Sequence, residues 1–241
     1  MPFPIENAWR ICIILALLLW GSAFVLWAHG EIDEQVLFYY DPLRAGQAPA
    51  ILLSQALSTY GIALIALLYG LHLWLGTTFE HVKVPVAIYV LILCSLGLSG
   101  IAGDVLKVVF SRPRPDVSYA GQIMMVDHWH TPAFPSGHAT KSMALALPFL
   151  CYGPIRKWIH HAIRLATTLL ALGVCGSRVI LAAHYTSDVL AGIGMAFLGL
   201  PLAILVTNTI LKRYAQENDH RLRSICGGLL AIVAVIAALT G

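Results

Sequence analysis

The sequence predicts an all-α protein, a polytopic bundle of transmembrane helices. Of its 241 residues, 59% are hydrophobic and only 11% are charged, and the mean hydropathy is +0.78. A soluble domain is about 45–50% apolar and about 25% charged. These values exclude a soluble globular domain, a disordered tail and a disulfide-rich secreted module. We therefore expect residues 1–241 to form a single membrane-embedded domain.

Seven apolar runs predict the helices. The run at 11–28 lacks a small-residue cleavage site before the acidic residues that follow it, so we expect a retained span rather than a signal peptide. Pro113 and Pro115 end the third helix near Arg112. The last run is short, and we expect it to span only with a tilted or thinned fit. The expected helices cover residues 11–28, 51–76, 84–109, 136–152, 163–183, 187–211 and 225–240.

The positions of Lys and Arg predict the orientation. With a cytoplasmic N-terminus, nine of the 15 basic residues face the cytoplasm, as the positive-inside rule favours. The other six lie on the exterior side, and five of them crowd around helix ends, where topology disfavours cations. An anionic ligand would explain their placement. We expect a multi-pass protein of the cytoplasmic (inner) membrane, with its site facing the periplasm or exterior. The net charge of +3 is too small to indicate a nucleic-acid partner.

Three clusters of polar residues lie at exterior helix ends. They are Lys107-x6-Arg114-Pro115, then Pro135-Ser136-Gly137-His138, then Ser177-Arg178-x5-His184-x3-Asp188. The third and fifth helices run outward, and the fourth and sixth begin on that side. Simple alternation of the helices therefore predicts that all three clusters reach one membrane face.

These residue types suit phosphoryl transfer. Charge in the transition state lies on the equatorial oxygens of the phosphoryl group, which need fixed donors. Lys107, Arg114 and Arg178 supply cationic donors. Ser136 and Gly137 lie at an expected helix N-terminus, where unpaired N–H groups and the helix dipole favour an anion.

Two histidines fit the covalent chemistry. His184 and Asp188 are four residues apart, which places them on one face of a helix. A carboxylate there holds one ring nitrogen protonated and leaves the other free to attack phosphorus. His184 is the candidate nucleophile. His138 is the candidate general acid for the leaving oxygen.

Three further ionisable residues are candidates for a supporting role around the phosphate. Asp104 lies one turn before Lys107 and either pairs with it or tunes the site. Arg112 and Lys141 are each either an interfacial anchor or a neighbour of the phosphate.

A divalent metal is the chemical alternative. His138, His184, Asp188 and Asp104 carry suitable donor atoms. The three cations of the clusters would repel such an ion by roughly a few kcal/mol each. We therefore expect neither a metal nor a cofactor.

The three clusters together resemble the signature of the type 2 phosphatidic acid phosphatase (PAP2) superfamily, and they match it in residue type, order and spacing over residues 107–188. The resemblance implies a six-helix core, to which the seventh span is an addition. It implies a metal-independent lipid phosphatase with a phosphohistidine intermediate. It also implies that His184 is the nucleophile, Asp188 its orienting partner and His138 the leaving-group acid. The implied phosphate cradle comprises Lys107, Arg114, Ser136, Gly137 and Arg178.

Two alternatives remain open at this point. The same site would serve a phosphotransferase that passes the phosphate to a lipid or sugar. A lipid or anion transporter would bind phosphate without cleaving it. The expected partners are membrane lipids and a lipid phosphate, with polyprenyl diphosphate, phosphatidylglycerophosphate, phosphatidate and lipid A phosphate all chemically acceptable. Residues in the 29–50 and 116–134 loops and at a lateral opening between helices would choose among them.

Overall fold

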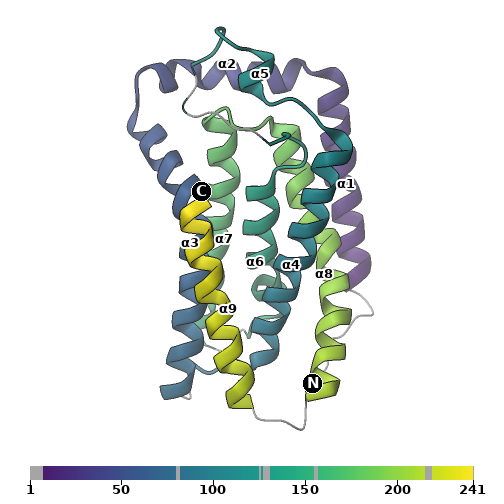
Figure 1. Cartoon of the computed structure of the whole chain (residues 1–241), viewed down its shortest axis with the longest axis vertical. Helices are drawn as coiled ribbons and strands as arrows, with labels where there is room; N and C mark the ends of the chain where they lie inside the picture. The colour runs from purple at the N-terminus through teal and green to yellow at the C-terminus, as the bar shows by residue number, and fades with distance from the viewer. Residues whose placement is uncertain are drawn as a thin grey trace.

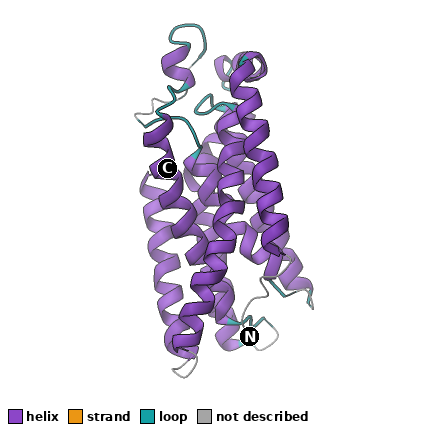
Figure 2. Ribbon diagram, turned by 90° about the vertical axis from the view of Figure 1, so that its right-hand side faces the viewer, coloured by secondary structure: helices purple, strands orange, loops and turns teal. Residues whose placement is uncertain are grey.

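The computed structural model describes residues 8–79, 82–124, 126, 131–154, 157–214 and 219–240, and all regular secondary structure in these ranges is helical. The long helices run along one axis, and α2 and α5 lie across one end of the bundle, the upper end in Figure 1. Figure 2 shows the same bundle from the side. The helices are α1 (Ala8–His29), α2 (Glu31–Ala45), α3 (Pro49–Thr78), α4 (Val86–Phe110), α5 (Pro115–Ser118), α6 (Gly137–Tyr152), α7 (Trp158–Ile180), α8 (Thr186–Tyr214) and α9 (Asp219–Thr240).

Six helices in the described ranges are long and apolar enough to cross a membrane, namely α1, α3, α4, α7, α8 and α9. The shortest of their apolar segments has 21 residues, which covers about 31 Å, the thickness of a bilayer core. Large apolar side chains on their outer faces are exposed, whereas the centre is a packed apolar core. The prediction of a polytopic all-α membrane bundle is confirmed.

The helix α6 departs from the predicted pattern of spans. It begins at Gly137 as expected but has only 16 residues, so it is about 24 Å long and shorter than the hydrocarbon core. It packs against α4, α7 and α8 at the centre of the bundle (Figure 1). Because protein surrounds it, the interior of the bundle rather than the bilayer sets its length.

The last helix is longer than predicted. The apolar run at 225–240 was expected to need a thinned or tilted fit, but α9 starts at Asp219 and has 22 residues. Its first turns are polar and were left out of the apolar run. The helix therefore reaches across a membrane without help from bilayer thinning.

Most of the expected 29–50 loop forms α2. Its buried Arg44 donates hydrogen bonds to the carbonyls of Leu37 at 2.6 Å, Met124 at 3.1 Å and Ile180 at 3.0 Å. These bonds hold α2 against the end of α7. A segment that looked like a surface loop thus becomes a fixed cover over one end of the bundle.

A close approach of α8 holds the start of α6 in place. A Cβ atom at Gly192 would lie 2.6 Å from the carbonyl oxygen of Ser136 and 3.0 Å from Cβ of Ala139. Only glycine leaves room for this contact. The N-terminus of α6, which carries the second motif, is therefore pressed against α8, which carries the end of the third.

Candidate active site

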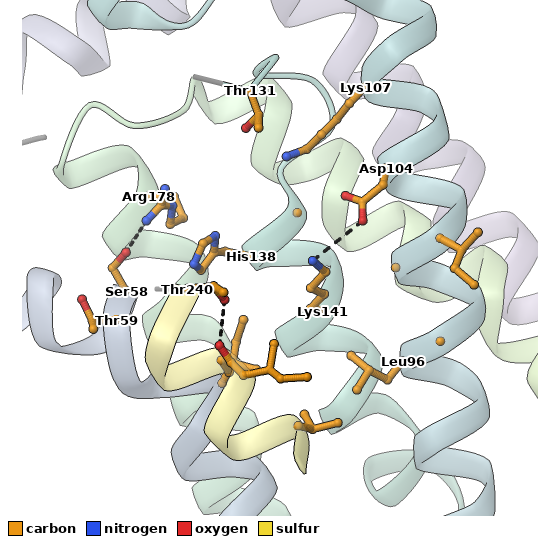
Figure 3. Close-up of a pocket in the computed structure, with 18 of the residues that line it drawn as sticks. Ser58, Thr59, Leu96, Asp104, Lys107, Thr131, His138, Lys141, Arg178 and Thr240 are labelled. Atoms are coloured by element: carbon orange, nitrogen blue, oxygen red, sulfur yellow. Dashed lines mark hydrogen bonds and ion pairs between the residues drawn. The ribbon is translucent and has the colours of Figure 1, made fainter. Parts of the chain in front are cut away.

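The structure brings residues of all three motifs together near the end of the bundle that α2 covers. A cavity of about 690 Å³ there is lined by side chains from α3, α4, α6, α7 and α9 and from the loop before α6 (Figure 3). His184 and Asp188 lie outside this lining and are 1% and 0% exposed. The sequence-predicted residues that line the cavity are Lys107, Arg114, Gly137, His138 and Arg178, with Asp104 and Lys141 from the supporting set.

The start of α6 forms one wall of the cavity. The backbone N–H of Ser136 donates to the carbonyl of Asp188 at 2.9 Å, which ties this N-terminus to α8. A Cβ at Gly137 would lie 3.3 Å from Nζ of Lys107, so the ammonium group sits directly against the helix start. The first N–H groups of a helix have no intrahelical partner and carry partial positive charge. Helix end and ammonium together have the charge and geometry that suit an anion.

Arg114 is fixed by bonds to two segments. Its Nε donates to the carbonyl of Thr131 at 2.5 Å, and its Nη2 donates to Oγ1 of the same residue at 2.8 Å. Its Nη1 donates to the carbonyl of Ala183 at 2.8 Å and lies 3.3 Å from Nε2 of His184. The guanidinium group thus links the cavity to the buried histidine.

Arg178 lies in the last turn of α7 and is fully buried at 0% exposure. Its Nη1 donates to Oγ of Ser58 on α3 (Figure 3). Sequence reasoning missed Ser58, because a lone serine in an apolar run carries no signal of its own. The serine therefore holds the charged side chain of Arg178 in place at the wall of the cavity.

His184 lies in the turn between α7 and α8, where its two ring nitrogens have different neighbours. Nδ1 is 3.3 Å from Oδ2 of Asp188, which also accepts the backbone N–H of Tyr185 at 3.0 Å. Nε2 faces Arg114 at 3.3 Å. A guanidinium group can only donate, so Nε2 is the acceptor and the ring proton is on Nδ1, facing the carboxylate.

The surroundings of His184 favour the neutral ring. Burial, followed by the positive charges of Arg114, Arg178 and Lys107, lowers the pKa of His184 well below the ordinary imidazole value. At neutral pH the ring is uncharged and its Nε2 carries a lone pair. That is the state an attacking imidazole needs.

Arg112 is neither an interfacial anchor nor a lining residue of the cavity. It is 7% exposed, and its Nη1 lies 2.6 Å from Oδ1 of Asp188. Its Nη2 lies 3.2 Å from Oδ2 of Asp33 on α2, and its guanidinium carbon lies 3.9 Å from the ring centroid of Tyr185. Arg112 therefore neutralises the carboxylate that orients His184.

Asp33 is a second residue that sequence reasoning missed. It is 2% exposed, and its Oδ1 accepts the backbone N–H of Ser187 at 3.0 Å, at the start of α8. Its Oδ2 bonds the hydroxyl of the same serine. The sequence places Asp33 between other acidic residues, which looks like a solvated charge run. The burial of Asp33 between α2 and the start of α8 could not be inferred from that pattern.

The supporting residues Asp104 and Lys141 pair with each other. Oδ2 of Asp104 is 3.9 Å from Nζ of Lys141, with the two side chains 58% and 43% exposed (Figure 3). Asp104 also acts electrostatically on Lys107, so it serves both cations at the mouth of the cavity. Such an exposed pair contributes little to stability. Within the described residues, no group of three or more His, Cys, Asp or Glu side chains is arranged to hold a metal ion.

Comparison with known proteins places this geometry in a family. The family model of the PAP2 superfamily matches residues 88–214, more than half of the chain and all three motifs. The chain belongs to the PAP2 superfamily. Its fold is similar to the crystal structure of the first transmembrane PAP2 type phosphatidylglycerolphosphate phosphatase from Bacillus subtilis, with a TM-score of 0.59 and 19% identity. The alignment covers 86% of this chain and 98% of that one.

No curated protein gives a significant match to this PAP2 chain. Membership of the PAP2 superfamily, together with six helices able to span a membrane, makes it a multi-pass membrane phosphatase. A membrane-embedded phosphatase of this fold acts in contact with lipid, and a lipid phosphate is the general class of substrate.

Proposed function

We propose that this PAP2 protein hydrolyses the phosphate or diphosphate end of a lipid through a phosphohistidine on His184. The observation that carries the proposal is the environment of Nε2. This nitrogen bears a lone pair, lies 3.3 Å from the guanidinium of Arg114, and belongs to a ring that burial keeps neutral. A nucleophile beside fixed cationic donors is what phosphoryl transfer requires.

The first step forms a bond from Nε2 of His184 to phosphorus and breaks the bond from phosphorus to the leaving oxygen. His138, which lines the cavity, gives that oxygen its proton. Lys107, Arg114, Arg178 and the start of α6, with Ser136 and Gly137, hold the equatorial oxygens. Asp188 holds the proton on Nδ1 and stabilises the ring as it gains positive charge.

The second step returns the enzyme to its starting state. Water attacks phosphorus, the bond to Nε2 breaks, and His138 takes the proton that water loses. Inorganic phosphate leaves, and His184 is neutral again. The reaction balances without a metal or cofactor, in agreement with a site built from cationic side chains.

The substrate proposal remains a class of lipid phosphates. The structural neighbour is named for phosphatidylglycerophosphate, which supports that lipid as a candidate beside polyprenyl diphosphates, phosphatidate and lipid A phosphate. The proposed site faces the periplasm or exterior of the cytoplasmic (inner) membrane, with the N-terminus in the cytoplasm. The distribution of basic residues supports this orientation.

A panel of purified lipid phosphates, assayed for phosphate release with and without a strong chelator, tests the proposal. We expect turnover of at least one lipid, unchanged by chelator, and complete loss in His184→Ala. A matched variant, His161→Ala, changes an exposed histidine of α7 that does not line the cavity and should retain activity. Full activity in His184→Ala, or loss with chelator that added metal restores, would contradict the mechanism.

The same panel separates the two alternatives. Appearance of a phosphorylated lipid or sugar in place of free phosphate would indicate a phosphotransferase. Lipid or anion transport that survives His184→Gln, without hydrolysis in the parent, would indicate a transporter. Quenching with detergent at alkaline pH during turnover should trap a phosphorylated parent protein and none in His184→Ala, because the P–N bond of a phosphohistidine survives alkali and is hydrolysed by acid.

A further inference from the structure

The cavity that holds the cations continues toward the middle of the membrane with apolar walls. Lys107, Arg114, His138 and Arg178 line the part of the cavity nearest the end that α2 covers. Apolar side chains line the part nearer the middle of the bundle. This apolar part shares one continuous space with the phosphate site. The apolar lining residues are Ile62 of α3, Leu96 and Ile101 of α4, and Val233, Ile236 and Ala237 of α9.

The helix α9 forms one wall of this space. In the described residues, the backbones of α3 and α4 stay apart and the two helices meet through the hydrogen bond between Tyr89 and His72 at 2.8 Å, whereas α9 packs along α3 and touches α4 more lightly. Figure 1 shows α9 in front of the gap between them. The PAP2 match ends at residue 214, before α9 begins at Asp219. A segment outside the family match therefore lines the site of the family reaction.

One stripe of α9 faces the cavity. Val233, Ile236, Ala237 and Thr240 all line it, and their spacing of three and four residues places them on a single helix face. Thr240 lies near His138 and Ser58, at the cation end of the stripe (Figure 3). The stripe thus leads from the membrane-facing surface to the phosphate site.

A neighbouring face fixes α9 to α3. Ala234 of α9 packs with Ala63 and Ala66 of α3, and small side chains allow the two helices to approach closely. Ile236, by contrast, is 55% exposed although it lines the cavity. Ile236 therefore lies where the cavity opens to the outer surface of the bundle, away from the face of α9 that packs against α3.

We propose that the groove between α9 and α4 binds the hydrocarbon chain of the substrate lipid, and that Ile236 and Ala237 set which chains fit. This inference rests on the proposed lipid phosphatase activity. The cationic and apolar residues line one cavity. A lipid whose phosphate contacts the cations therefore places its hydrocarbon chain against the apolar part of that cavity.

The test compares lipids with one head group and different chains. Dioleoyl and dihexanoyl phosphatidate form one pair, and undecaprenyl and farnesyl diphosphate form the other. Ile236→Trp adds bulk to the groove, whereas Val235→Trp adds it at a neighbouring position that is 59% exposed and does not line the cavity. We expect Ile236→Trp to lower kcat/KM for the long-chain lipid about tenfold and to leave the short-chain value unchanged. Val235→Trp should change neither.

A second pair of variants covers the case in which the new tryptophan turns outward into lipid. Ala237→Phe places bulk at a partly buried position of the stripe, and Ala238→Phe places it at an exposed position that does not line the cavity. The first should lower the long-chain to short-chain ratio of kcat/KM, and the second should not. Equal ratios in both cavity-side variants and their controls overturn the inference.

Different results would contradict the lipid phosphatase activity and the role of α9 in chain selection. If the parent protein releases phosphate from none of the four lipids, nor from phosphatidylglycerophosphate or lipid A phosphate, the proposed function fails. If the parent hydrolyses a lipid and the chain-length ratio ignores Ile236 and Ala237, the activity stands and the role of α9 does not.

Discussion

Arg112 and Asp188 form a buried ion pair in which Nη1 and Oδ1 are 2.6 Å apart, on the side of the carboxylate away from His184. The other oxygen of Asp188 lies 3.3 Å from Nδ1 of His184. One carboxylate thus serves a fixed cation and a titrating ring at once. Because Arg112 offsets its charge, Asp188 orients the imidazole without drawing a second proton onto it.

Arg112→Gln should lower kcat and move the acid limb of the kcat/KM profile to higher pH. Without the guanidinium, the charge of Asp188 acts fully on His184 and raises the pKa of its ring, by about one pH unit or more. Protonation then removes the lone pair on Nε2 at a pH where the parent is still active. The measurement is kcat/KM against pH for the parent and the variant.

Arg112→Lys keeps the charge and should restore part of the loss, and Arg213→Gln changes an exposed arginine of α8 as a control. A purely structural role for Arg112 would reduce the amount of folded protein and leave the position of the acid limb unchanged. Size-exclusion chromatography in detergent separates the two effects.

The parent enzyme should keep its activity to a pH below the ordinary imidazole value. Burial and three neighbouring cations depress the pKa of His184, so the neutral ring persists as pH falls through about 6.5. The acid limb of kcat/KM should therefore lie below that pH. The second pKa of a phosphate ester is about 6, so the ionisation of the substrate must be titrated separately. A histidine-dependent limb above pH 7 would contradict the depressed pKa.

His138→Ala should affect lipid monophosphates more than lipid diphosphates. An alkoxide leaves poorly without a proton, and a general acid contributes about 10²–10⁴-fold to such a step. A phosphate leaving group needs less help, so phosphoenzyme should form faster from a diphosphate in this variant. Rapid-quench measurement of phosphoenzyme from both substrates checks this. Equal losses on both would show that His138 does not protonate the leaving oxygen.

Gly192→Ala should destabilise the site as well as the fold. Its new methyl group would meet the carbonyl of Ser136 at 2.6 Å, which pushes the start of α6 away from α8. Overpacking of this kind costs about 1–3 kcal/mol, and we expect a lower Tm and reduced turnover. Gly228→Ala is the matched control, because a Cβ there would meet nothing within 4 Å. It should hold or raise the Tm, since alanine favours helix more than glycine does. A Gly192→Ala protein as stable and active as Gly228→Ala would refute the contact.

Some elements were predictable because their signal is local. Each of α1, α3, α4, α7 and α8 is apolar over a length that can cross a bilayer. Hydropathy along the chain was therefore enough to predict them. The three motifs concentrate charge where a membrane protein avoids it, and helix alternation placed them at one end. Hydropathy predicts too short an α9 because its first turns are polar. It predicts α6 as a span because sequence does not show that protein surrounds this short helix.

By itself, the sequence determined that the chain is a membrane bundle and that three motifs of candidate site residues gather at one end of it. Hydropathy and motif spacing are properties of neighbouring residues, and they need no knowledge of packing. Only the tertiary structure decided that Asp33 and Ser58 support the site, that Arg112 neutralises Asp188, and that α9 walls the cavity. Each of these depends on contacts between segments far apart in the chain, where burial and distance, rather than residue type, determine what a side chain does.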